Sequence, residues 1–197
     1  RDKLVTGVQT CALPISVINM CNHSYFNLSG NPKNDVLNDL LYVNADTYTP
    51  VDSTFMTTGA IDSVKNTPMD FTTAKAIGQD IKKFDFIQLK NGNGYDHNWV
   101  LSTGGDVNKL AAKVISPLSG ISLEVFTDEP GIQVYTGNFL NGTVKGKKGN
   151  VYQQHAGICL ETQHYPDSPN KPQWPTVVLE PGKVYRSTCI YKFGVEK

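Results

Sequence analysis

Glycine and proline interrupt this chain so often that long helices have little room to form. Its 197 residues include 17 glycines and 11 prolines. Between them lie short runs rich in β-branched and aromatic residues, the pattern of strands bounded by turns. The runs expected to form strands are 40–43, 99–102, 110–115, 121–127, 133–136, 158–162, 176–179 and 185–193. The sequence therefore predicts an all-β fold.

Turn chemistry joins several of these runs. The Leu-Ser-Gly sequence at 118–120 separates two alternating runs and predicts a β-hairpin. Two Glu-Pro-Gly sequences, at 129–131 and 180–182, combine the fixed φ of proline with the positive φ that glycine tolerates. Residues 74–83 are the one stretch with a plausible helical pattern. We predict antiparallel sheets packed as a β-sandwich, with one short helix.

Length and charge limit the classes of function. An all-β sandwich of this length is commonly one domain. Eighteen basic residues balance eighteen acidic ones, so no long-range attraction to nucleic acid is expected. No apolar run approaches the ~20 residues that cross a bilayer. We expect a soluble monomer, cytoplasmic or periplasmic, without nucleic-acid or membrane partners.

The four cysteines do not form a metal-binding pattern. They lie at positions 11, 21, 159 and 189, with no Cys-x-x-Cys pair and no Cys/His spacing typical of zinc. We expect all four to be buried small apolar side chains, and we expect no structural metal.

The first sixteen residues differ from the rest of the chain. Residues 1–16 show no clear period, and Pro14 interrupts any regular element there. The stretch resembles translated adapter sequence of the kind that contaminates sequence assemblies. We predict that residues 1–16 are a non-native leader.

Two segments carry side chains suited to proton transfer. His23 lies in the polar and aromatic stretch 22–27, and a histidine ordinarily titrates near pH 6.5. Glu161 follows the apolar run 158–160, and a carboxylate is rarely buried unless it is paired or functional. Taken alone, a histidine is more often structural and a strand-end glutamate is more often exposed.

Three further residues are candidates for binding a polyhydroxylated ligand. Tyr25 can present an aromatic face to a sugar ring. Asp96 follows Gly-Asn-Gly-Tyr at 92–95 and can accept hydrogen bonds from two hydroxyl groups, although an aspartate in a turn is the simpler interpretation. Strand alternation places Gln133 on the face opposite Ile132. By itself, a solvated surface glutamine is the simpler interpretation there.

Six separated blocks together resemble the galactose mutarotase (aldose 1-epimerase) family. In order they are NHSYFNLSG, YVNADTYTPVDSTFMTTG, TPMDF, GYDHNWVL, QVYTGNFLNG and CLETQHYPDSPN. The blocks run from about residue 17 to the C-terminus, and a chance histidine or glutamate would not produce all six. The resemblance implies a supersandwich of large antiparallel sheets with an open cleft for a sugar.

The resemblance also implies a reaction and its residues. His23 matches the family's general acid and Glu161 its general base, while Tyr25, Asp96 and Gln133 match contacts to the substrate. The implied activity interconverts the α and β anomers of free hexoses such as glucose and galactose, without a required cofactor. Some bacterial relatives are associated with calcium, and four carboxylates offer oxygen ligands: Asp46, Asp52, Asp96 and Asp167.

Family members carry a further N-terminal stretch that this chain does not match. The resemblance implies that this stretch supplies opening strands of the sandwich, an arginine and a second histidine at the sugar. We therefore predict that residues 17–197 are the C-terminal portion of a single aldose 1-epimerase domain, incomplete at its N-terminus. Activity is expected of the intact parent protein rather than of this chain alone.

Three other functions remain open. A noncatalytic carbohydrate-binding β-sandwich would need the aromatic and polar residues without the proton carriers. A glycoside hydrolase would use Asp96 and Glu161 as paired carboxylates and would leave His23 without a role. A hexose-phosphate epimerase would need clustered arginine or lysine, which the six blocks lack.

Overall fold

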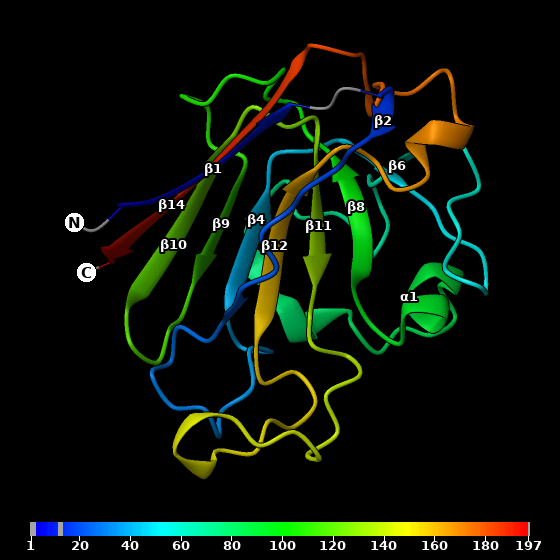
Figure 1. The fold of residues 1–197 in the computed structure, drawn as a ribbon. Helices are drawn as coiled ribbons and strands as arrows, with labels where there is room; N and C mark the ends of the chain where they lie inside the picture. The colour runs from blue at the N-terminus through cyan, green and yellow to red at the C-terminus, as the bar shows by residue number, and fades with distance from the viewer. Residues whose placement is uncertain (1–2, 12–13, 197) are drawn as a thin grey trace.

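The computed structural model describes residues 3–11 and 14–196. These residues form two six-stranded antiparallel sheets and a separate pair of two-residue strands, β2 (Ser16–Val17) with β13 (Val178–Leu179). The first sheet has the order β1 (Lys3–Cys11), β14 (Val184–Val195), β10 (Ile121–Thr127), β9 (Ala112–Ile115), β4 (Leu40–Val43) and β7 (Lys75–Ala76). The second has the order β3 (Tyr25–Phe26), β12 (Ile158–Gln163), β11 (Gly131–Tyr135), β8 (Asp96–Val100), β5 (Thr47–Thr49) and β6 (Asp62–Ser63). Figure 1 shows the two sheets as layers, which confirms the predicted all-β sandwich.

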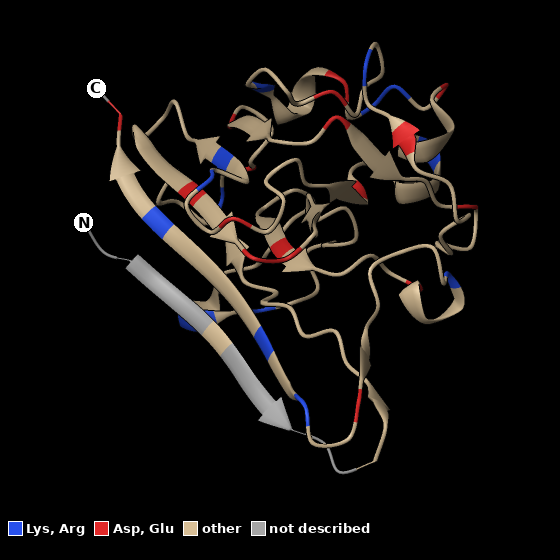
Figure 2. Ribbon diagram, turned by 90° about the horizontal axis from the view of Figure 1, so that it is seen from above, with Lys and Arg blue, Asp and Glu red and all other residues tan. Residues whose placement is uncertain are grey.

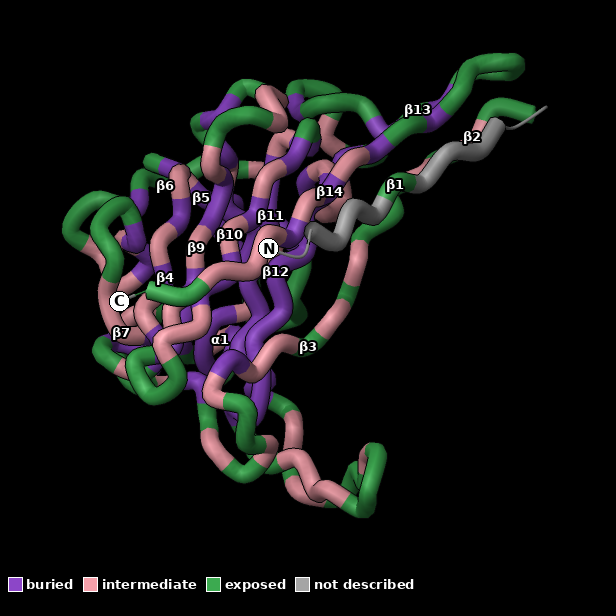
Figure 3. The backbone as a smooth tube through the Cα atoms, turned by 90° about the vertical axis from the view of Figure 1, so that its left-hand side faces the viewer, coloured by how far each residue is buried: buried purple, intermediate pink, exposed green. Residues whose placement is uncertain are grey.

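The core lies between the two sheets. Apolar residues from both layers are fully or almost fully buried there, and Figure 3 colours much of the central strands as buried. Tyr191 in β14 crosses between the layers, where its hydroxyl donates a hydrogen bond of 2.6 Å to the carbonyl of Leu160 in β12. The central members of the core are Leu41, Val43, Val114, Leu123, Val125, Trp99, Ile132, Val134, Ile158 and Leu160.

Each predicted strand overlaps an observed one, and the predicted hairpin at 118–120 joins β9 to β10. The pattern did not indicate five short strands, β2, β3, β5, β6 and β7. Strands of two or three residues carry too few alternations to stand out from loops. β3, β6 and β7 are edge strands of the two six-stranded sheets, and β5 lies between β8 and β6.

The helix predicted at 74–83 is wrong. That stretch contains β7 and a 3₁₀ turn at Ile77–Gln79. Its backbone hydrogen bonds go elsewhere, because the amides of Ile77 and Gly78 donate to the carbonyls of Asp39 and Leu37. The α-helix of this region is instead α1 (Ile87–Gly92), which ends at Asn93 in the left-handed conformation. Two further 3₁₀ turns lie at Lys147–Gly149 and Ser168–Asn170.

A long strand lies in the segment where the sequence pattern indicates none. The backbone of β1 pairs with β14 in antiparallel register from Lys3 opposite Lys192 to Cys11 opposite Val184. Pairing of this kind does not reveal where a segment came from. The origin of residues 1–16 as a non-native leader therefore stays a prediction, as does the domain boundary at residue 17.

Basic and acidic positions are both spread over several loops and strands rather than gathered in one region (Figure 2). None of the described helices has the length and hydropathy of a membrane span.

Candidate active site

Strand β12 has one face in the core and one in the candidate site. Ile158 and Leu160 are fully buried in the core, so strand alternation places Cys159 and Glu161 on the opposite face. Glu161 lies inside the strand rather than at its end, and it is almost completely buried. The interpretation of Glu161 as an exposed strand-end residue is therefore wrong.

Neighbouring strands bring three of the predicted residues to the same face. In the register of the sheet, Gln133 of β11 lies opposite Glu161 of β12, and Tyr25 of β3 lies opposite Cys159. Asp96, the first residue of β8, lies opposite Tyr135 of β11. The side-chain amide of Gln133 donates a hydrogen bond of 2.8 Å to Asp96 Oδ1, so Gln133 is not a free surface glutamine.

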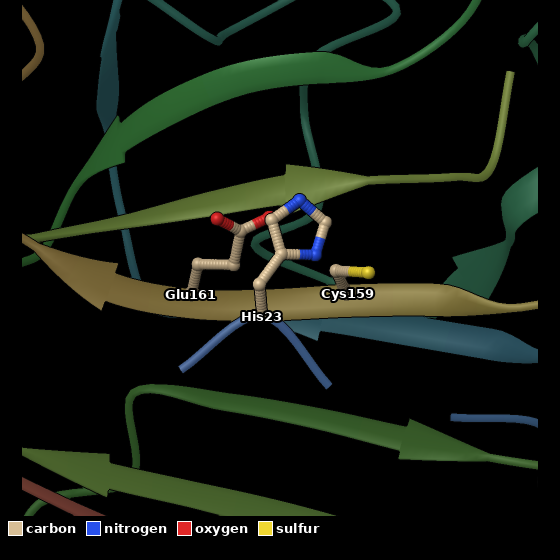
Figure 4. Close-up of side chains that lie close together, drawn as sticks. All are labelled: His23, Cys159 and Glu161. Atoms are coloured by element: carbon tan, nitrogen blue, oxygen red, sulfur yellow. The ribbon is translucent and has the colours of Figure 1, made fainter. Parts of the chain in front are cut away.

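His23 lies over this face from the irregular segment that precedes β3. Its Nε2 is 3.3 Å from Glu161 Oε1, and the two side chains meet in Figure 4. The imidazole is 51% exposed, whereas the carboxylate is only 8% exposed. The His23 ring stacks on Tyr25 at 5.2 Å between centroids and meets the edge of Tyr135 at 6.1 Å. The structure thus gathers all five predicted site residues on one face.

Hydrogen bonds to His164, just after β12, and to Tyr185 of β14 anchor the segment that carries His23. Asn19 forms a reciprocal pair with the backbone of His164, since its Nδ2 donates to the carbonyl at 2.9 Å and its Oδ1 accepts from the amide at 3.0 Å. The amide of Met20 donates to the hydroxyl of Tyr185 at 3.3 Å. His164 Nδ1 lies 2.6 Å from the buried Glu129. The sequence pattern offered no signal for Asn19, because its role depends on a partner far away in the chain.

A polar pocket of about 220 Å³ opens beside Asp96 and Gln133. Its other lining residues include Thr49, Asn98 and Phe55. A concave site with a few converging polar groups is the usual form of a small-molecule site. The pocket therefore extends the polar face toward β5.

Comparison with known proteins assigns the chain to a family. The aldose 1-epimerase family model matches residues 9–192, which is most of the chain. The chain belongs to the aldose 1-epimerase family. This confirms the resemblance of the six sequence blocks.

Individual relatives of this family member agree with that assignment. The chain is 41% identical to galactose mutarotase from Rattus norvegicus over 193 residues, covering 98% of the chain and 54% of the relative. It is 40% identical to aldose 1-epimerase from Escherichia coli over 181 residues, covering 91% of the chain and 51% of the relative. The solved galactose 1-epimerase from Lactobacillus acidophilus superposes with a TM-score of 0.84 at 30% identity, covering 99% of the chain and 54% of that structure. The chain spans about half the length of the curated relatives it matches.

Burial sets the electrostatics of the candidate site in this family member. Removal from water raises the pKa of Glu161, and the nearby Asp96 raises it further, while His23 and the Cys21 thiol act in the opposite direction. Burial also raises the pKa of Asp96, against the hydrogen bond from Gln133. A carboxylate that holds its proton more tightly than usual is a stronger base once ionised. Perturbed carboxyl groups of this kind cluster at functional sites.

The cysteines depart from the expectation that all are buried. Cys159 and Cys189 are buried, but Cys21 is exposed, and its thiol donates to Glu161 Oε2 at 3.4 Å. Burial and the neighbouring carboxylate raise the pKa of Cys21 to about 11. The side chain of Cys11 lies outside the described residues. Cys21 and Cys159 are thus parts of the site that sequence spacing did not reveal.

His97 borders the pocket beside Asp96, but it has no role in the proton transfer proposed for the site. It is fully buried on the core face of β8, where burial lowers the pKa of the imidazole to about 4. Neutral histidines in such positions are packing residues.

The four carboxylates considered for calcium have separate local partners. Asp46 accepts from Ser102, Asp52 from Thr54, Asp96 from Gln133, and Asp167 pairs with Lys171. No three of these carboxylates converge within the described part of the chain.

Proposed function

We propose that the protein is an aldose 1-epimerase that interconverts the α and β anomers of free hexoses such as glucose and galactose. The main support is the contact of 3.3 Å between His23 Nε2 and Glu161 Oε1 on a polar face that also carries Asp96. Relatives named galactose mutarotase and aldose 1-epimerase add to it.

The chemistry follows from the two proton carriers. The anomeric hydroxyl and the ring oxygen are bonded to the same carbon, so a base and an acid must reach two neighbouring oxygens. Glu161 removes the proton of the anomeric hydroxyl, and the electron pair forms the aldehyde as the bond from C1 to the ring oxygen breaks. Protonated His23 delivers its proton to that oxygen. Rotation about C1–C2 presents the other face of the aldehyde, and closure follows with the two residues in exchanged roles.

The remaining predicted residues hold the sugar. Asp96 accepts hydrogen bonds from sugar hydroxyl groups, and Gln133 fixes the carboxylate by donating to Oδ1. Tyr25, which is half exposed beside His23, offers an aromatic face to the ring. Both proton carriers belong to the chain itself, so the proposal includes no required cofactor. It also includes a soluble monomer, cytoplasmic or periplasmic, that can take up calcium at the carboxylates without requiring it for the reaction.

Anomer exchange is the direct test. The relaxation of freshly dissolved α-glucose and α-galactose is followed by polarimetry, with the 197-residue chain and the full-length protein from an intact copy of the gene measured side by side. A rate above the buffer rate in the full-length protein supports the proposal. Sugar binding without acceleration would favour a carbohydrate-binding module, and release of reducing sugar from a disaccharide would favour a glycoside hydrolase. Activity restricted to hexose phosphates would favour the phosphate epimerase.

Asp96→Asn is expected to act mainly on sugar binding. The amide keeps the shape but loses the charge that strengthens hydrogen bonds from hydroxyl groups, a difference of about 1.5–3 kcal/mol for a charged partner. We expect KM to rise about 10- to 100-fold, with a smaller fall in kcat. Asp106→Asn, in the turn after β8, is the control and leaves KM unchanged. An unchanged KM in Asp96→Asn would remove this residue from the binding site.

The activity should fall with acid at a higher pH than an exposed glutamate would cause. Only ionised Glu161 can accept the proton, and burial raises its pKa above the ordinary value. Activity is therefore present above the raised pKa and is lost as the pH falls through it. A profile of kcat/KM against pH should show an acid limb with a midpoint above about 4.3, the usual glutamate value. A midpoint at or below that value would contradict the assignment of Glu161 as the base.

A further inference from the structure

We infer that the candidate site also binds a thiophilic divalent cation such as Zn²⁺, held by His23, Cys159 and Glu161. One atom from each of the three side chains lies within 4.8 Å of the other two. Figure 4 shows the thiol and the carboxylate on the same side of β12, with the imidazole of His23 beside both. None of the functions considered above gives the Cys159 thiol a role.

The spacing of these atoms suits a small cation. Zinc binds nitrogen and oxygen at about 2.0–2.2 Å and sulfur at about 2.3 Å in a tetrahedron, which places ligand atoms roughly 3.3–3.8 Å apart. His23 Nε2 and Glu161 Oε1, at 3.3 Å, already have this separation. The longest separation, at most 4.8 Å, must close by up to about 1 Å. His23 can make that movement, because its side chain is half exposed and its segment is not part of the sheet.

The other two ligands are fixed by the sheet. Cys159 and Glu161 are two residues apart in β12, so the strand itself points both to one face. The Cys21 thiol donates a hydrogen bond to Glu161 Oε2, and the other carboxylate oxygen, Oε1, faces His23. Supporting contacts of this kind orient a metal ligand. Thiolate, imidazole and carboxylate together form a ligand set that zinc accepts. The fourth position of the tetrahedron is left for water.

Occupancy of this site would stop proton transfer. A bound cation takes the carboxylate oxygen that accepts the proton of the anomeric hydroxyl and the imidazole nitrogen that serves the ring oxygen. The Cys159 thiol gives its proton to the buffer when it becomes a ligand. Zn²⁺ is therefore a reversible inhibitor that competes with sugar. This last step rests on the proposed function, whereas the metal site itself does not.

Cobalt provides the test of the site, because a thiolate ligand to Co²⁺ produces a charge-transfer absorption in the near ultraviolet. The 197-residue chain is titrated with Co²⁺ alone, and we expect the band to saturate at one equivalent and to disappear when Zn²⁺ is added. Cys159→Ser should abolish the band, whereas Cys189→Ser, a buried cysteine of the other sheet, should keep it. Glu161→Gln and His23→Asn should weaken cobalt binding about tenfold or more, as loss of a ligand does. Circular dichroism checks that each variant is folded.

Several results would overturn the site. The first is the absence of the band in the parent chain, and the second is its persistence in Cys159→Ser. The third is a band that is lost in Cys21→Ser but kept in Cys159→Ser, which would assign the metal to the exposed thiol.

The link to catalysis is tested separately with the full-length protein. Zn²⁺ should raise the apparent KM for sugar, and Cys159→Ser should need at least about tenfold more Zn²⁺ to reach half inhibition of its own zinc-free rate. If the cobalt band appears but no preparation accelerates anomer exchange, the metal site is supported and the proposed epimerase function is refuted. If anomer exchange is accelerated but no cobalt band appears, the epimerase function is supported and the metal site is refuted. Inhibition that sugar does not relieve would separate the metal from the substrate pocket.

Discussion

Glu161→Gln is expected to reduce the rate of anomer exchange about 10²- to 10⁴-fold, the range that a positioned general base contributes. Glutamine keeps the size of the side chain, and it can still fill the space beside Cys21 and His23 on β12. It has no basic oxygen of comparable strength, so the proton of the anomeric hydroxyl has no acceptor. The loss should appear in kcat when the full-length protein is followed by polarimetry, with KM changed much less.

The chain offers a matched control for this substitution. Glu129 is also a buried carboxylate, and it also pairs with a histidine, His164, at 2.6 Å. Glu129→Gln therefore repeats the same chemical change outside the polar face of β12, and it should reduce the rate far less than Glu161→Gln does, because Glu129 only supports residues that hold the His23 segment. Glu161→Gln should melt at or above the parent temperature at neutral pH, because burial disfavours the charged form of Glu161. A Glu161→Gln protein that is folded and keeps most of its activity would refute the role of base.

His23→Asn is expected to produce the second large loss, again about 10²- to 10⁴-fold in kcat. Asparagine retains a polar side chain but cannot deliver a proton to the ring oxygen. Because the imidazole is half exposed and lies outside the sheet, the free energy of unfolding should change little. Polarimetry gives the rate, and thermal unfolding gives the stability.

His164→Asn is the control for His23. This substitution removes the partner of Glu129 but keeps the backbone bonds between residue 164 and Asn19, which involve no imidazole atom. Its activity should stay near the parent value. If His164→Asn were as damaging as His23→Asn, the loss would reflect the position of the segment rather than proton transfer by His23.

The sequence predicted the central strands because their apolar residues are packed between two layers. Ile121–Thr127 and Ile158–Gln163 each pair on both sides, and most of their apolar residues are buried in the core, so the pattern is strong. The helix at 74–83 was wrong because its amides find partners in residues 37–39. Local pattern does not record such a tertiary partner.

In the site, too, some residues could be predicted from the sequence and others depend on tertiary contacts. His23, Glu161, Asp96, Gln133 and Tyr25 were predicted from blocks of sequence, and the structure brings them to one face. Cys159 could have been placed near Glu161 by strand alternation alone. The contacts of Cys21 and Asn19 could not, since each depends on how an irregular segment crosses a sheet from which it is distant in sequence.

Glu161 is held in a buried central strand, whereas His23 lies in an irregular segment that is held by few contacts. Every residue of β12 is buried, and the strand is bonded to β11 along its length, so Glu161 moves only when the sandwich itself comes apart. His23 depends on a few side-chain contacts at the ends of an exposed segment, and such segments open locally at little cost. Gentle warming or dilute urea would therefore move His23 away from Glu161 while the two sheets remain folded. Loss of activity would then precede unfolding of the sheets.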